Sequence, residues 1–205
     1  MSTKFGARRI GGTLALAAAA FALVAPGTAG AGLLSTGTAS SCDPNVSQAF
    51  EDWGDTASYR LLPGGSFEGG ASWSLSGGAK IVSGNEPFGL EDGTRSLLVP
   101  AGATATSPTV CFAFGDLHSR FVVRSTGGSG KLEVDVMVKS LLGILSVLDG
   151  GTVAADGTWD PSPRVSALVT NVGGLLTTKA ISLRFHAQGT SFQVDDVYLD
   201  PFRGT

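Results

Sequence analysis

The sequence predicts an all-β protein, a jelly-roll β-sandwich of two antiparallel sheets with an irregular N-terminal lead-in. The chain has 30 Gly and is only 15% charged, a composition that suits a turn-rich β domain because Gly destabilises helices. Short strand-like runs recur at regular intervals between Gly-rich turns after residue 60. The first and the last of these runs, 61–68 and 191–200, carry acidic residues and are expected to lie side by side as core strands.

The first 31 residues are predicted to be a secretory signal peptide. Basic residues (Lys4, Arg8 and Arg9) precede a short apolar run at 14–24, and small residues follow at 29–31. The apolar run is shorter than the ~20 residues that span a bilayer, although an uncleaved anchor remains the alternative. We therefore expect a secreted, extracellular protein.

Residues 32–60 are expected to form a linker and a disulfide-tethered lead-in, and residues 61–205 the sandwich domain. The chain has two cysteines, Cys42 and Cys111, and an exported chain with one such pair most simply forms one disulfide. Such a bond would tie the lead-in to the sandwich. Residues 42–60 contain aromatic residues without strand alternation, which indicates irregular structure with one helical turn.

The first half of the domain reads as short strands joined by turns. Gly77 and Gly78 separate two strand-like runs, 73–76 and 79–83, as in a β-hairpin. Residues 84–94 form an acidic loop. Strands are then expected at 95–100, at 104–114 with an edge or kink at Pro108, and at 120–125.

The second half continues this pattern. Residues 131–139 alternate between apolar and polar, which predicts one packed face and one wet face. Residues 141–148 are more apolar and are expected to be buried on both faces or packed under a loop, before a turn at 149–151. A proline-containing connection at 159–163 precedes the last strands, at 164–170, 179–186 and 191–200.

Charge and motif content argue against several functions. The net charge is −3, and removal of the basic leader makes the chain more acidic, so no nucleic-acid or membrane partner is expected. His118 and His186 lack zinc-ligand spacing with the cysteines. No nucleophile elbow, P-loop or dinucleotide fingerprint occurs, and the acids of the 84–94 loop are clustered rather than opposed. We therefore expect that the protein has no catalytic residues and is not an enzyme.

Four stretches in order resemble family 4/9-type carbohydrate-binding modules, which are jelly rolls of the galactose-binding-like class. Gly64 stands where that family usually has Asn. The chain also resembles exported actinobacterial proteins of unassigned function, on the lead-in residues Trp53-Gly54-Asp55 and Tyr59. The four family-like stretches are Pro63–Gly70, Trp73–Leu75, Ser96–Val99 and Phe192–Leu199.

The resemblance implies a structural calcium ion between the first and last strands. Its ligands would be Glu68 and one of Asp195 or Asp196, completed by backbone carbonyl groups. Adjacent buried carboxylates are costly unless a cation or hydrogen-bond donors compensate them, and calcium prefers oxygen ligands. The alternative is a strand bulge with one acid exposed and the other bonded to backbone N–H groups.

The aromatic residues are the candidate sugar-binding groups, because pyranose faces stack on flat rings. Trp159 is the best candidate, followed by Trp53 and Tyr59, whereas Trp73 alternates with Leu75 and is expected in the core. The predicted function is a non-catalytic module that binds carbohydrate or cell-wall glycan. The alternative is an exported structural or protein-interaction domain with no sugar site, which burial of all three Trp residues would favour.

Overall fold

The computed structural model describes residues 45–69, 72–112, 118–139, 145–167 and 179–200. The predicted signal peptide at 1–31 and Cys42 lie outside these residues. In the described part of the chain, no helix is long and apolar enough to cross a membrane.

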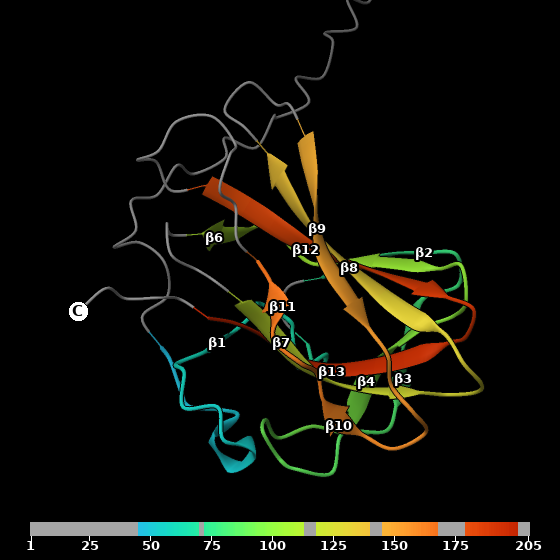
Figure 1. Cartoon of the computed structure of the whole chain (residues 1–205), viewed down its shortest axis with the longest axis horizontal. Coiled ribbons are helices and arrows are strands. Elements are labelled where there is room, and N and C mark those ends of the chain that lie inside the picture. The colour runs from blue at the N-terminus through green and yellow to red at the C-terminus, as the bar shows by residue number, and fades with distance from the viewer. Residues whose placement is uncertain (1–44, 70–71, 113–117, 140–144, 168–178, 201–205) are drawn as a thin grey trace, which may run out of the picture. The chain divides into compact units, whose positions relative to one another are not determined.

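The fold is a jelly-roll sandwich of two antiparallel sheets, as the sequence predicts (Figure 1). One sheet has seven strands in the order β10-β7-β13-β4-β3, with β1 paired to β13 and β11 paired to β7. Its strands are β1 (Arg60–Leu61), β3 (Lys80–Ser83), β4 (Arg95–Val99), β7 (His118–Ser125), β10 (Asp160–Pro161), β11 (Val165–Ser166) and β13 (Phe192–Leu199).

The other sheet has six strands in the order β2-β5-β12-β8-β9, with β6 paired to β12. The longest pairing joins β12 to β8 over nine consecutive partners, from Ala180 opposite Lys139 to Gln188 opposite Lys131. Its strands are β2 (Ser74–Ser76), β5 (Thr104–Thr106), β6 (Val110–Phe112), β8 (Lys131–Lys139), β9 (Leu145–Val153) and β12 (Lys179–Gln188).

The opening strand lies beside the closing strand, as expected. Arg60 pairs with Leu199, and Leu61 pairs with Tyr198. The predicted strand at 61–68 is nevertheless too long, because the chain leaves the sheet after Leu61 and turns. Proline has no N–H to donate and glycine favours turns, so Pro63 and the glycines after it end the pairing.

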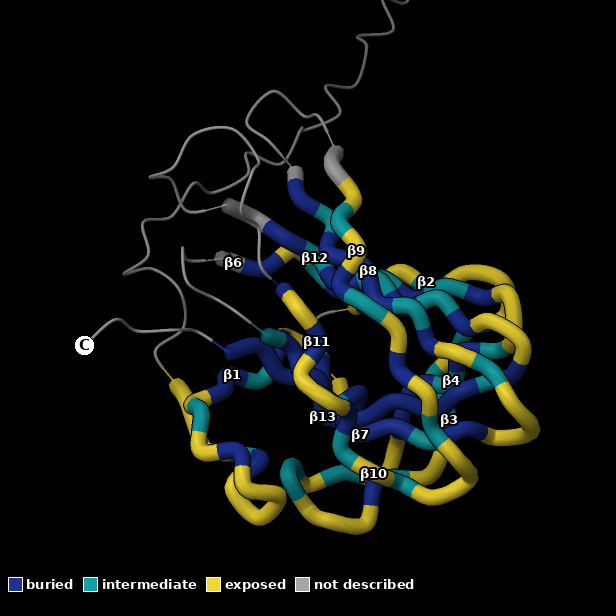
Figure 2. Tube along the Cα trace, in the orientation of Figure 1, coloured by how far each residue is buried: buried dark blue, intermediate teal, exposed yellow. Residues whose placement is uncertain are grey.

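The core lies between the two sheets, and Figure 2 shows buried residues in strands of both. Trp73 stacks on Phe185 with 5.6 Å between ring centroids, and Phe185 meets Phe121 edge to face at 4.9 Å. Trp73 is therefore a core residue, as its alternation with Leu75 predicts. Its indole N–H donates a 3.0 Å hydrogen bond to the Gly64 carbonyl oxygen, which satisfies the one polar group on that ring.

Two strand predictions need correction. The turn expected at 149–151 is instead part of β9, whose register against β8 shifts between Val134 and Asp135. A bulge accommodates the extra residue without breaking the strand. Val147 in the same strand is 47% exposed, so this strand is not buried on both faces.

Two further predictions are confirmed. Pro108 separates β5 from β6 and marks the expected kink, since proline has no N–H for the sheet. The lead-in contains one helical turn, the 3-10 helix η2 (Glu51–Trp53).

Candidate functional site

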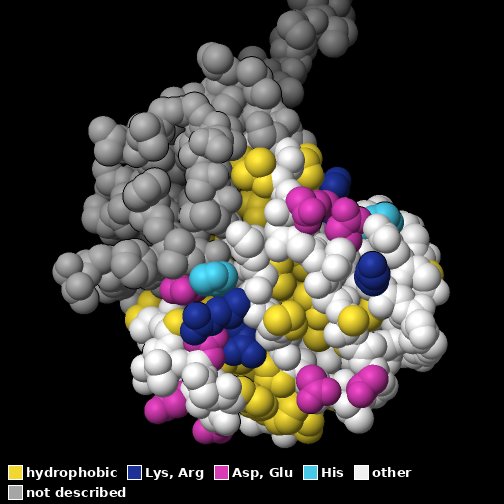
Figure 3. Space-filling view, viewed as in Figure 1, with side chains coloured by type: hydrophobic (Ala, Val, Ile, Leu, Met, Phe, Trp, Pro, Cys, Tyr) yellow, Lys and Arg dark blue, Asp and Glu magenta, His cyan; other side chains and the backbone are white. Residues whose placement is uncertain are grey.

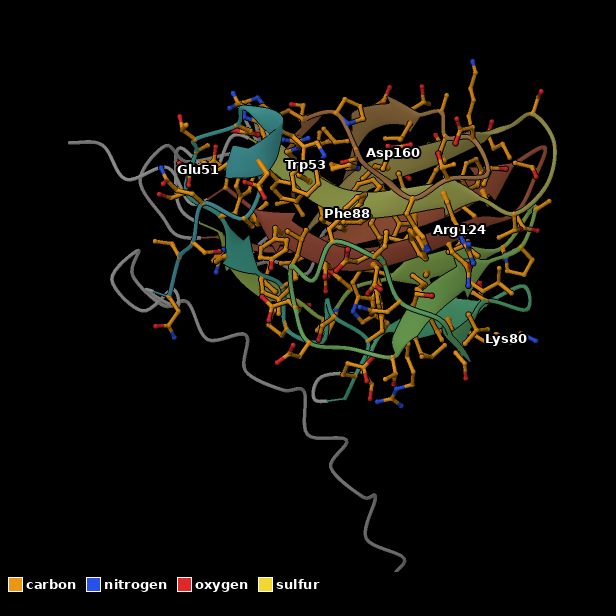
Figure 4. The ribbon with its side chains drawn as sticks, turned by 90° about the horizontal axis from the view of Figure 1, so that it is seen from below. Glu51, Trp53, Lys80, Phe88, Arg124 and Asp160 are labelled. Atoms are coloured by element: carbon orange, nitrogen blue, oxygen red, sulfur yellow. The ribbon has the colours of Figure 1, made fainter. Side chains whose placement is uncertain are left out.

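The outer face of the seven-stranded sheet carries a row of side chains that crosses four strands. Gln193 on β13 pairs with Arg124 on β7 and with Leu98 on β4, and Leu98 pairs with Lys80 on β3. Paired residues share a face of a sheet. We call Lys80, Leu98, Gln193 and Arg124 the outer row. Figure 4 looks onto this side of the sheet.

Arg124 occupies one end of the outer row in a fixed position. Its Nε–H donates a 2.6 Å hydrogen bond to Gln193 Oε1, and its guanidinium carbon lies 4.8 Å from the Trp159 ring centroid. Gln193 in turn donates a 3.4 Å hydrogen bond to Ser96 Oγ. Trp159 is half-buried beside β10.

The lead-in covers the far part of the same face. Phe50 packs edge to face against Tyr59 and Tyr198, with centroid distances of 5.1 and 5.6 Å. These three rings are almost completely buried and form a small cluster of their own outside the main core. The lead-in is thus packed onto the closing strand by aromatic contacts.

Asp55 fixes the lead-in electrostatically. Its carboxylate accepts a 2.7 Å hydrogen bond from Arg120 Nη1, a 3.0 Å bond from Arg164 Nε and a 2.8 Å bond from the Tyr59 hydroxyl. The Arg164 contact in particular holds the pKa of Asp55 well below its usual range, and burial raises the pKa of the Tyr59 hydroxyl. The sequence pattern did not reveal this cluster, because Arg120 and Arg164 are far from Asp55 in the chain.

The loop between β3 and β4, residues 84–94, covers the middle of the face and is held by the acids of β13. Asp195 Oδ2 accepts a 3.2 Å hydrogen bond from the Glu86 backbone N–H, and Asp196 Oδ2 accepts a 3.1 Å bond from the Glu91 backbone N–H. The Tyr198 hydroxyl donates a 2.7 Å hydrogen bond to Glu91 Oε1. The closing strand therefore anchors the loop at two points.

Glu68 and Glu86 hold other parts of this loop. Glu68 Oε1 accepts hydrogen bonds of 2.7 and 2.6 Å from the backbone N–H groups of Thr94 and Arg95. The Glu86 carboxylate accepts backbone hydrogen bonds at the loop tip from Phe88, Gly89 and Leu90.

The three predicted calcium ligands thus meet the same loop, although each makes its hydrogen bonds at a different point. Among the described residues, no group of three or more His, Cys, Asp or Glu side chains is arranged to hold a metal ion.

Asp195 and Asp196 are both buried, which differs from the expected alternative of one buried and one exposed acid. Burial raises the pKa of Asp195 to about 7, and burial together with the neighbouring Asp195 charge raises the pKa of Asp196 to about 8. Asp196 adopts a left-handed backbone (φ 46°), and the register against β7 shifts between Asp195 and Tyr198. The bulge brings two consecutive carboxylates under the loop, because a regular strand would point them to opposite faces.

Two exposed aromatic residues lie above these anchored segments. Trp53 of η2 is 38% exposed, and Phe88 at the loop tip is 39% exposed. Their rings meet edge to face with 4.9 Å between centroids (Figure 4). In Figure 3, hydrophobic side chains gather at the lower centre of the surface. In Figure 1, which has the same view, β10 lies in this region.

The predicted sugar-binding residues differ in accessibility. Trp53 is exposed and Trp159 is half-buried, whereas Tyr59 is completely buried and bonded to Asp55, so its ring cannot stack on a ligand. Phe88 was not among the candidates, because an isolated Phe in an acidic loop carries no periodic signal. Cys111 lies in β6, but the pairing predicted for it involves Cys42, which is outside the described residues.

Comparisons with solved structures find carbohydrate-binding modules at low identity. The CBM22-1 xylan-binding domain from Paenibacillus barcinonensis is 12% identical, with a TM-score of 0.47 over 68% of this chain and 93% of that domain. The family 11 module from Clostridium thermocellum is 16% identical, with a TM-score of 0.40 over 69% of this chain and 94% of that module. No family model and no curated protein matches the sequence.

Proposed function

We propose that this chain is an exported, non-catalytic module that binds carbohydrate on the outer face of its seven-stranded sheet. The observation that carries the proposal is the exposed Trp53–Phe88 pair beside a face that also holds Trp159 and the outer row. The predicted signal peptide supports export, and a cell-wall or other extracellular polysaccharide would be the partner.

The chemistry of this face suits a sugar. A pyranose has an apolar face that packs on an aromatic ring and a rim of hydroxyl groups that exchange hydrogen bonds. The Trp53 and Phe88 rings supply the apolar surface, and Arg124 supplies a guanidinium that the buried Gln193 amide holds in place. These groups are already held in place by Ser96, Trp159 and the anchored loop, so little conformational freedom is lost on binding.

A calcium ion at Asp195 and Asp196 is our second proposal. Support comes from charge: both carboxylates are buried, and neither forms an ion pair with a cationic side chain in the part of the chain that the structure describes. Asp195, Asp196 and Glu68 provide the oxygen donors that calcium prefers. The ion would supply the positive charge that offsets these carboxylates and would strengthen the attachment of the 84–94 loop.

A protein-interaction domain is the alternative function, and one observation favours it. Aromatic residues are enriched at protein interfaces, and the Trp53–Phe88 pair would serve as a binding anchor there as well. The two functions differ in the ligand that the pair recognises.

A glycan array separates these possibilities. Wild-type protein should bind a defined set of glycans, and Trp53→Ala and Phe88→Ala should each lose most of that signal. Val147→Ala removes a comparably exposed apolar side chain from the six-stranded sheet and should bind like wild type. Absence of any glycan signal for folded wild-type protein would overturn the carbohydrate proposal.

A further inference from the structure

We propose that the glycan bound on this face is an acidic one, whose sugar carboxylates are recognised by Arg124. This inference rests on the proposed function and names the class of its ligand.

The Arg124 guanidinium is held in a position from which its Nη groups could donate hydrogen bonds to a carboxylate. Its Nε–H is used by Gln193 and its guanidinium lies over the Trp159 ring, so the plane of the group is set from two sides. Among the described residues, Nη1 and Nη2 of Arg124 have no hydrogen-bond acceptor within bonding distance. Two free N–H groups on one guanidinium edge match the two oxygens of a carboxylate.

Arg124 also differs from other arginines of the domain in its charge environment. Four other arginines form ion pairs with carboxylates: Arg95 with Glu68, Arg120 and Arg164 with Asp55, and Arg184 with Asp135. Arg124 has only neutral partners, the Gln193 amide and the Trp159 ring, within the described part of the chain. Its positive charge is therefore available to a ligand.

The charges around Arg124 are consistent with this role. Asp160 on the neighbouring strand pairs with Val123, and paired residues share a face, so Asp160 belongs to the face opposite Arg124. Exposed Lys80 lies in the outer row three strand spacings away, a separation of roughly 14 Å between Cα atoms. Two cations along one row match an extended ligand with repeated negative charges.

The negative net charge of the chain helps to separate specific recognition of an acidic glycan from general attraction to a polyanion. The chain carries −3, so general attraction to a polyanion is not expected, and preference for an acidic glycan would have to come from local groups. An exposed Arg–carboxylate contact is sensitive to salt, because mobile ions screen it.

The experiment compares three acidic polysaccharides, polygalacturonate, glucuronoxylan and hyaluronan, with their carboxyl-reduced forms. Binding is measured by affinity electrophoresis in chelator for wild type, Arg124→Gln and Arg124→Lys. Lys131→Gln is the matched control, since it removes one exposed positive charge from the other sheet. The melting midpoint of each variant confirms that it is folded.

We expect wild type to bind at least one acidic polysaccharide at least tenfold more tightly than its reduced form. Arg124→Gln should abolish this preference, Arg124→Lys should keep part of it, and Lys131→Gln should keep all of it. Equal binding of both forms, dependent on Trp53, would overturn the acidic ligand and leave the proposed function standing. An unchanged preference in Arg124→Gln would overturn the role of Arg124, and failure to bind any glycan would overturn both.

Discussion

Asp195 Oδ2 accepts a 3.2 Å hydrogen bond from the backbone N–H of Glu86, a residue 109 positions earlier in the chain. This bond joins the closing strand to the loop that carries Phe88. The Glu86 carboxylate then accepts hydrogen bonds from the next backbone N–H groups along the loop. The position of an exposed aromatic ring on the candidate site is thus set by a buried acid of the sheet.

Replacing Glu86 with Ala should loosen the loop tip without removing any residue that would contact a ligand. Three backbone N–H groups lose their carboxylate acceptor, while Asp195 loses a neighbouring negative charge, so the two effects on global stability oppose each other. We expect faster amide hydrogen exchange at 88–90 and severalfold weaker glycan binding. Unchanged exchange at these amides would contradict the anchoring role of Glu86.

Stability should depend on pH through Asp195 and Asp196 when calcium is absent. Their pKa values in the folded protein, about 7 and about 8, lie above that of Asp in an unfolded chain, about 3.9. The folded state therefore binds more protons than the unfolded state between these values. Their contribution to stability is complete below about pH 4 and is lost as pH rises through 7 to 8.

Thermal melts in chelator at pH 5 and pH 9 measure this dependence. The double variant Asp195→Asn/Asp196→Asn cannot titrate at these positions and should lose the part of the pH slope that they cause. An identical slope in wild type and double variant would show that the two acids are not responsible.

Calcium should raise the melting midpoint of wild type at pH 8 and leave the double variant unchanged. The ion offsets two buried charges that form no ion pair with a cationic side chain in the described part of the chain, and a ligand that binds only the folded state stabilises it. The measurement is a melt at millimolar calcium, followed by chelation. A midpoint that neither rises with calcium nor falls on chelation would end the calcium proposal.

Asp55→Asn should destabilise the domain by about 3–5 kcal/mol, because two arginines lose their common anionic partner, and Arg120 is largely buried. The folded pKa of Asp55 is depressed, so its contribution is present above about pH 4 and is lost as the pH falls further. Chemical denaturation at pH 7 gives the free energy of unfolding. Asp52→Asn, an exposed acid of η2, is the control and should change it by less than about 0.5 kcal/mol.

The sandwich could be predicted from sequence because its strands carry local signals. Each of these signals depends only on residues that are close in the sequence. Examples are the alternation in 131–139, the paired glycines at 77–78 and the proline at 108. The adjacency of the first and last strands followed from the fold class. The length of the first strand was wrong because turn residues after Pro63 outweighed the strand-forming residues around them.

The candidate site was predictable only in part. Trp53 was identified by residue type alone, but burial of Tyr59 depends on Phe50, Tyr198 and Asp55, which pack together only in the folded chain. Phe88 and Arg124 acquire their significance from partners that are distant in the sequence, Trp53 for Phe88 and Trp159 and Gln193 for Arg124. No local pattern reports such long-range contacts.

Isothermal titration calorimetry with the glycan selected on the array tests the central claim most directly. Trp53→Ala and Phe88→Ala should each weaken binding at least tenfold, about 1.4 kcal/mol, while changing the melting midpoint little, since both rings are more than one-third exposed. Val147→Ala should bind like wild type. Wild-type affinity in both aromatic variants would contradict a binding site on this face.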